Sequence, residues 1–81
     1  MSTVTVRYWA AVRAAAGRTE EQASAGTLDE IAAELAARRG ERLERILGYC
    51  TFLLDGRPMH DRTATVEPGS TLEVLPPFDG G

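Results

Sequence analysis

Several residue types are scarce or missing in this sequence. It contains no lysine, one cysteine and one tryptophan in 81 residues, and aromatic residues make up only 6% of it. A single cysteine excludes an intramolecular disulfide bond. Without lysine, the chain has no side-chain amine that an activated chain terminus could acylate, although compositional bias of the genome is the simpler explanation.

Long apolar stretches are also missing. No run approaches the roughly 20 residues of a membrane-spanning helix, and the first five residues lack the basic and apolar regions of a signal peptide. We therefore expect a cytoplasmic protein that does not bind a membrane. All nine positively charged side chains are arginine and the net charge is −3, so the sequence offers no basic footprint for nucleic acid.

The residues that are present fit an ordinary globular domain. Hydrophobic residues make up 43% of the chain and charged residues 26%, which argues against disorder. The length predicts one domain with a small core. The patterns predict strands and helices in this order: a strand at 3–9, a short helix at 10–16, an edge strand at 18–24, a long helix at 27–39, a short helix at 41–47, and strands at 49–54, 63–67 and 71–75.

The long helix is the clearest of these elements. Thr27 and Glu30 have the spacing of a capping box. Apolar residues then follow at the spacing of one helical face, namely Leu28, Ile31, Ala32 and Leu35. One main helix and four or five strands predict an α+β fold, in which the helix packs across one face of a mixed sheet.

Strand alternation predicts which side chains face the core. The first strand should direct three alternating residues inward, namely Val4, Val6 and Tyr8. Trp9 then either packs on the other face or is exposed as a docking surface, and packing is favoured because tryptophan is usually well buried. In the edge strand, the charges of Glu20 and Glu21 would block unwanted pairing with another strand.

No self-contained active site is predicted within the domain. The sequence has no glycine-rich phosphate loop, no cluster of metal ligands and no nucleophile paired with a base. Cys50 is interpreted as a small buried hydrophobic residue, because it has no CxxC partner or nearby histidine. His60 has no second ligand near it in the sequence, so a solvated residue is favoured over a metal ligand. The arginines between positions 38 and 45 are typical of a solvated helix face.

The unusual chemistry lies at the end of the sequence. Residues 1–75 form the predicted domain, and an extended tail follows: Pro76, Pro77, Phe78, Asp79, Gly80 and Gly81. The prolines hold the stem extended, and the glycines lack a Cβ, so the tip fits a narrow channel. A carboxylate on Gly81 is unreactive until it is activated, for instance as an acyl-adenylate, after which it can accept sulfide, an amine or a thiol. The alternative is a frayed chain end without a function.

Four segments together resemble a known family. They are Val-Arg-Tyr-Trp-Ala-Ala-Val-Arg from residue 6, Thr-Leu-Asp-Glu-Ile from residue 27, Leu-Leu-Asp-Gly-Arg-Pro from residue 53, and Pro-Gly-Ser-Thr-Leu-Glu-Val-Leu-Pro-Pro-Phe-Asp-Gly-Gly from residue 68. Over nearly its whole length the chain is similar to the MoaD and ThiS family of ubiquitin-like sulfur carriers, and most similar to the small subunit of molybdopterin synthase. Members often have a small apolar pair before the two glycines, whereas this chain has Phe78-Asp79, which bears on the choice of partner.

The resemblance implies a β-grasp fold and a function for the tail. Gly81 would be adenylated by a ubiquitin-activating-type enzyme that uses ATP, and would then become a thiocarboxylate. Gly80 would be the slim residue before it, and residues 76–79 would insert into the large catalytic subunit, where sulfur passes to a cyclic pterin monophosphate. The chain itself would bind no cofactor or metal and would not be catalytic alone. Carriers for thiamine, cysteine or another thio-metabolite pathway, a protein modifier and a plain interaction module are the alternatives.

Overall fold

The structure is a computed structural model that describes residues 2–77. Its main sheet has five strands in the order β2-β1-β7-β4-β5. The bounds of these strands are Glu20–Ser24 for β2, Thr3–Tyr8 for β1, Thr71–Leu75 for β7, Thr51–Leu54 for β4 and Arg57–Pro58 for β5. A separate two-stranded sheet pairs β3, Gly26–Thr27, with β6, Thr65–Val66.

The central strand of the main sheet is β7. It runs parallel to β1, with Leu72 opposite Val6, and antiparallel to β4, with Val74 opposite Phe52. The two outer pairs, β1 with β2 and β4 with β5, are antiparallel. The sheet is therefore mixed, as the sequence predicts, and the last strand within residues 2–77 lies in its middle.

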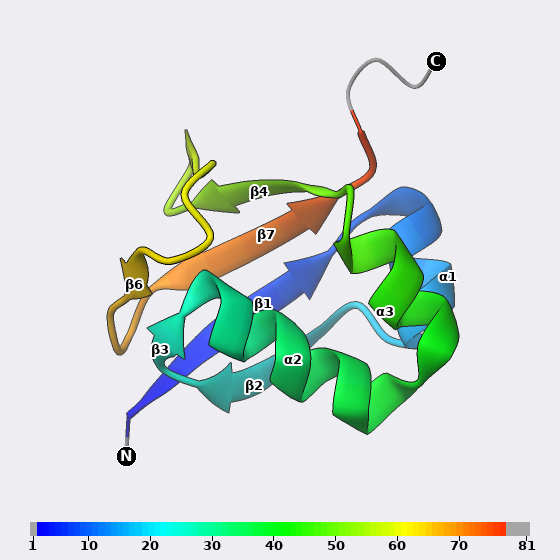
Figure 1. Cartoon of the computed structure of the whole chain (residues 1–81), viewed down its shortest axis with the longest axis horizontal. Coiled ribbons are helices and arrows are strands. Elements are labelled where there is room, and N and C mark those ends of the chain that lie inside the picture. The colour runs from blue at the N-terminus through cyan, green and yellow to red at the C-terminus, as the bar shows by residue number, and fades with distance from the viewer. Residues whose placement is uncertain (1, 78–81) are drawn as a thin grey trace.

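Three helices pack against this sheet, namely α1 (Ala10–Ala16), α2 (Leu28–Arg39) and α3 (Glu41–Leu47). Figure 1 shows α2 lying across the strands, with α1 and α3 toward the end of the sheet where β1 and β7 finish. The predicted capping box is confirmed, because the Thr27 hydroxyl accepts from the Glu30 amide at 3.1 Å and the Glu30 carboxylate accepts from the Thr27 amide at 2.9 Å. Gly17 ends α1 at φ 79°, a left-handed conformation that glycine adopts without strain.

The hydrophobic core fills the space between the sheet and the helices. The residues predicted to face inward from the first strand, Val4, Val6 and Tyr8, are at most 1% exposed. Leu28 and Leu35 of α2 are buried against the same core. Burial of each side chain of this size contributes about 1.5–3 kcal/mol relative to an exposed position, so the alternation in β1 and the helical face of α2 together define the core.

Several details differ from the expectations. The first strand ends at Tyr8 rather than at residue 9, and the edge strand begins at Glu20 rather than at residue 18. The strand expected at 49–54 begins at Thr51, because the Tyr49 amide still donates to the Ile46 carbonyl at 3.1 Å and prolongs the last turn of α3. Tyr49 is consequently 62% exposed. The strand expected at 63–67 is shortened to β6 and pairs with β3 outside the main sheet. Neither β3 nor β5 was predicted, because a strand of two residues shows no periodicity.

Candidate functional site at the root of the C-terminal tail

The predicted tail begins where the central strand ends. Leu75 is the last residue of β7 and pairs with Thr51 of β4. Pro76 and Pro77 follow directly, and both are partly buried. The chain leaves the sheet here, at the end where β1 and β7 finish (Figure 1). Because β7 has a neighbouring strand on each side, the sheet rather than a loop fixes the position of Pro76.

The remaining tail residues, Phe78, Asp79, Gly80 and Gly81, lie outside the described residues. Of the predicted inserting arm, the structure places Pro76 and Pro77 alone. The role of Gly81 as the acyl carbon and the roles of the residues before it stay predictions.

Trp9 packs beside this root on the face of the sheet opposite Val6 and Tyr8. Its backbone N–H donates to the Val74 carbonyl at 3.1 Å, and its indole Nε1–H donates to Glu73 Oε1 at 3.0 Å. The Arg7 guanidinium carbon lies 5.3 Å from the ring centroid, which is within cation–π range. Trp9 is partly buried, so the structure favours the packing interpretation. The side chains of Arg7, Trp9 and Glu73 form a row that links β1 to β7, the strand before the tail.

Cys50 and His60 line one surface hollow of about 480 Å³ beside β4, together with Met59 and Arg62. Burial raises the pKa of the Cys50 thiol to about 11, and the charge of Arg62 offsets this only in part. The thiol is therefore protonated at neutral pH and is a poor nucleophile, in agreement with the hydrophobic interpretation. Within residues 2–77, no three His, Cys, Asp or Glu side chains are grouped to hold a metal ion. No helix in that part of the chain is both long and apolar enough to cross a membrane.

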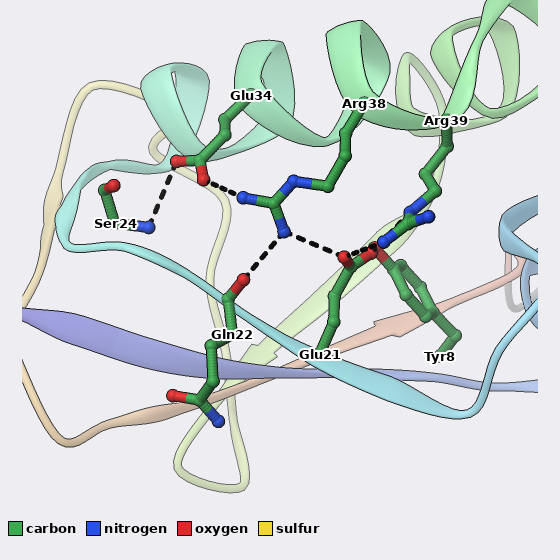
Figure 2. A network of polar contacts seen from close by, with 7 residues as sticks. All are labelled: Tyr8, Glu21, Gln22, Ser24, Glu34, Arg38 and Arg39. Carbon is green, nitrogen blue, oxygen red and sulfur yellow. Dashed lines mark hydrogen bonds and ion pairs between the residues drawn. The ribbon is translucent and has the colours of Figure 1, made fainter.

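A polar network centred on Glu21 joins β1, β2 and α2 (Figure 2). Glu21 accepts from the Tyr8 hydroxyl at 2.6 Å, from Arg39 at 2.5 and 3.1 Å, and from Arg38 at 2.8 Å. Burial alone would raise the pKa of Glu21, but the hydrogen bonds from Arg39, Tyr8 and Arg38 outweigh it and lower that pKa to about 2. Burial and the hydrogen bond to Glu21 raise the pKa of the Tyr8 hydroxyl above its usual value.

The expected edge strand is confirmed as β2, but Glu21 is not a charge on its open edge. Its side chain is only 5% exposed, because Glu21 lies opposite Val6 in the β1–β2 pair and shares its inward face. Arg38 and Arg39 both bind Glu21. Arg39 is partly buried, whereas Arg38, Arg42 and Arg45 are exposed as predicted. A signal was present in the sequence, since the hydroxyl of a buried tyrosine usually requires a hydrogen-bond partner.

Comparison with known proteins agrees with this architecture. The ThiS family model matches residues 6–81 of the chain. A chain from the complex of subunits 1 and 2 of molybdopterin-converting factor from Helicobacter pylori is 25% identical, with a TM-score of 0.72, and the match covers 98% of this chain and 99% of that chain. No curated protein sequence matches the chain significantly.

Two small archaeal modifier proteins are also similar in structure. Small archaeal modifier protein 1 from Methanosarcina acetivorans is 21% identical with a TM-score of 0.83, covering 100% of this chain and 98% of that chain. The protein of the same name from Haloferax volcanii is 18% identical with a TM-score of 0.80, covering 98% and 99%. These similarities confirm the predicted β-grasp fold, with a five-stranded mixed sheet and a main helix across it. The two shorter helices, α1 and α3, accompany the main one.

Proposed function

Since the chain belongs to the ThiS family of ubiquitin-like sulfur carriers, we propose that it carries sulfur as a thiocarboxylate on Gly81 and delivers it to cyclic pyranopterin monophosphate in molybdopterin biosynthesis. The observation that carries the proposal is the family match, which extends through Gly80 and Gly81. Support for the molybdopterin pathway comes from the likeness to a chain in the Helicobacter pylori complex of molybdopterin-converting factor subunits, at 25% identity.

The proposed chemistry takes place in two steps at the carboxyl group of Gly81. In the first step, a ubiquitin-activating-type enzyme joins the carboxylate to the α-phosphate of ATP, which forms an acyl-adenylate and releases pyrophosphate. In the second step, a sulfur donor at the oxidation level of sulfide attacks this carbonyl and releases AMP, which leaves the thiocarboxylate. The chain supplies the acyl group, and the partner enzymes supply the catalysis.

The root of the tail suits delivery into a partner's active site. Pro76 and Pro77 follow a strand that is fixed by β1 and β4, and proline restricts the backbone of the stem. The four residues after Pro77 span roughly 13–14 Å when extended, at about 3.3–3.6 Å each. A large catalytic subunit is therefore the partner that we propose, with this stem as the inserting arm.

The intact mass of the protein from its own cells tests the proposal. A carrier should include a species in which one oxygen is replaced by sulfur. Oxidation of Met1 or Met59 adds nearly the same mass, so the gain must be located on a C-terminal peptide. A variant with one residue added after Gly81 should lose this species and keep its fold. The proposal is wrong if the extended variant still acquires sulfur, or if Gly81 stays unmodified after incubation with ATP, cell extract and a sulfur source.

A protein modifier is the second candidate, because of the structural likeness to small archaeal modifier protein 1 at TM-scores of 0.83 and 0.80. In that role, Gly81 would form an amide with an amine of a target protein. Conjugates of higher mass that survive reductant and denaturant would support it. Complementation of a molybdopterin-deficient strain, with the cognate large subunit present, would support the carrier instead. A thiocarboxylate without complementation would indicate a carrier for thiamine, cysteine or another acceptor.

A further inference from the structure

Among the strands of residues 2–77, the outer strand β2 has a neighbour on one side alone. The Thr19 carbonyl before it and the Ala25 amide after it both bond toward the first strand segment, to the Tyr8 amide and the Ser2 carbonyl. Successive residues of a strand direct their backbone groups to alternate sides, so Gln22 and Ser24 direct theirs away from β1. An edge of this kind is a template for pairing with a strand of another chain.

Two side chains of α2 occupy this edge (Figure 2). The Ser24 amide donates to Glu34 Oε1 at 3.0 Å, and the Gln22 carbonyl accepts from Arg38 Nη1 at 2.8 Å. Glu34 and Arg38 lie one helical turn apart and form an ion pair with each other. A carboxylate acceptor and a guanidinium donor therefore stand where a neighbouring strand would present its C=O and N–H groups.

Arg38, the donor of this pair, is also held by a second acceptor. Arg38 Nη1 also donates to Glu21 Oε1 at 2.8 Å, and Glu21 is fixed by Tyr8 and Arg39. The side chains of Glu34 and Arg38 are 29% and 35% exposed. They therefore lie between the edge of β2 and the solvent. We propose that Glu34 and Arg38 form an edge clamp that prevents β2 from pairing with β2 of a second copy of this chain.

The sequence of β2 fits pairing with its own copy. Two such edges related by a two-fold axis would pair antiparallel and offer each other the same groups. An axis through Gln22 places Gln22 opposite Gln22, Glu20 opposite Ser24, and Glu21 opposite Ala23. Like charges directly opposite each other would oppose the pairing. This alignment places none opposite each other. The clamp, rather than the side chains of β2, is therefore the barrier to self-association.

Removal of the clamp tests the proposal. The Glu34→Ala/Arg38→Ala variant deletes both side chains at unchanged net charge, and alanine preserves the helix. The Glu41→Ala/Arg45→Ala variant is the matched control, because these exposed residues of α3 have the same charges and the same spacing. In sedimentation equilibrium, the clamp variant should approach roughly twice the monomer mass with rising concentration. The parent protein and the control should stay monomeric.

Amide hydrogen exchange and two further variants locate the contact. In the dimer of the clamp variant, the amides of Gln22 and Ser24 should exchange more slowly than in its dilute monomer. Adding Ser24→Pro removes the outward amide, a change that edge strands tolerate, and should restore the monomer. The Glu34→Gln variant keeps an acceptor oxygen for the Ser24 amide but loses the charge. It should stay monomeric, because the hydrogen bond rather than charge repulsion closes the edge.

A clamp variant that is folded and monomeric at all concentrations would overturn the proposal. A dimer in which the Gln22 and Ser24 amides exchange as freely as in the monomer would also overturn it, because another surface would then be responsible. If the double variant does not fold, Glu34→Ala/Arg38→Met gives the same two readings. Methionine keeps an apolar stem on α2 but cannot donate to the Gln22 carbonyl, and alanine at position 34 frees the Ser24 amide.

Discussion

The outer strand β2 and the central strand β7 of the main sheet are stabilised in different ways. On the β2 side, charge-assisted hydrogen bonds around Glu21 join the strand to α2, and its side chain is 5% exposed. The central strand β7, which leads into the tail, is held by backbone pairing with two neighbours and by the burial of Leu72 and Val74, both 0% exposed. Polar contacts stabilise the edge strand, whereas apolar burial stabilises the strand that carries the proposed site.

This difference follows from the position of each strand. A central strand satisfies its backbone groups within the sheet, so burial of its side chains suffices. An outer strand lacks one neighbour, and here side chains of α2 supply the missing partners. The partly buried groups beside the tail, Trp9 and Glu73, bond to each other at a surface that water reaches. In the proposed function, a partner that takes up the tail covers this surface without breaking a buried ionic network.

The largest effect is expected from truncation in the central strand. Leu72→Ala removes a fully buried side chain of β7 and should lower the free energy of unfolding by about 2–5 kcal/mol. Leu53→Ala is the matched control, because it makes the same change in the adjacent strand β4 at a partly exposed position. Urea unfolding followed by circular dichroism measures both. Equal losses in the two variants would contradict the assignment of the stability of β7 to burial.

An intermediate effect is expected at Glu21, and it depends on pH. Folding lowers the pKa of Glu21 from 4.5 to about 2, so the folded state favours the charged carboxylate. The stabilisation is therefore complete above pH 4.5 and is lost as the pH falls toward 2. The shift corresponds to at most about 3 kcal/mol. Glu21→Gln should lower the free energy of unfolding at pH 7 and flatten its decline between pH 5 and pH 2.

The pH dependence needs a control because other carboxylates titrate in the same range. Glu41→Gln removes one negative charge from an exposed position on α3 and should leave the decline of the parent protein unchanged. Urea midpoints at several pH values compare the three proteins. If Glu21→Gln declines as steeply as the parent, the network is not the source of the acid sensitivity. If Glu21→Gln lowers the free energy of unfolding at pH 7 more than Leu72→Ala does, the ranking of β2 and β7 is reversed.

Much of the fold could be predicted because its signals are local. The capping box at Thr27 and the alternation of Val4, Val6 and Tyr8 depend on residues close together in the chain, and both are confirmed. The partners of Glu21 could not be assigned in this way. Arg38 and Arg39 lie 17 and 18 residues away, and only the packing of α2 over β2 brings them together.

The candidate site shows the same limit. The composition of the tail and the family resemblance predict that the chemistry lies at Gly81; this stays a prediction, although the family match extends to residue 81. The strand order was not contained in any local pattern. That β7 is the central strand, and that Trp9 bonds to both Val74 and Glu73, follows from pairing between the two ends of the chain. The position of the tail's root at the end of the central strand is thus a property of the topology, which periodicity does not reveal.

The smallest effect is expected at Trp9, where the same kind of bond as in the Glu21 network is open to water. Trp9→Phe keeps an aromatic ring for Arg7 to cover but removes the Nε1–H that donates to Glu73. Because Glu73 is only partly buried, water can replace the lost donor. The free energy of unfolding should fall by about 0.5–1 kcal/mol. Glu73→Gln retains an acceptor for Trp9 and should lose less. If Trp9→Phe lowers the free energy of unfolding as much as Glu21→Gln does, the central strand β7 also depends on polar bonds.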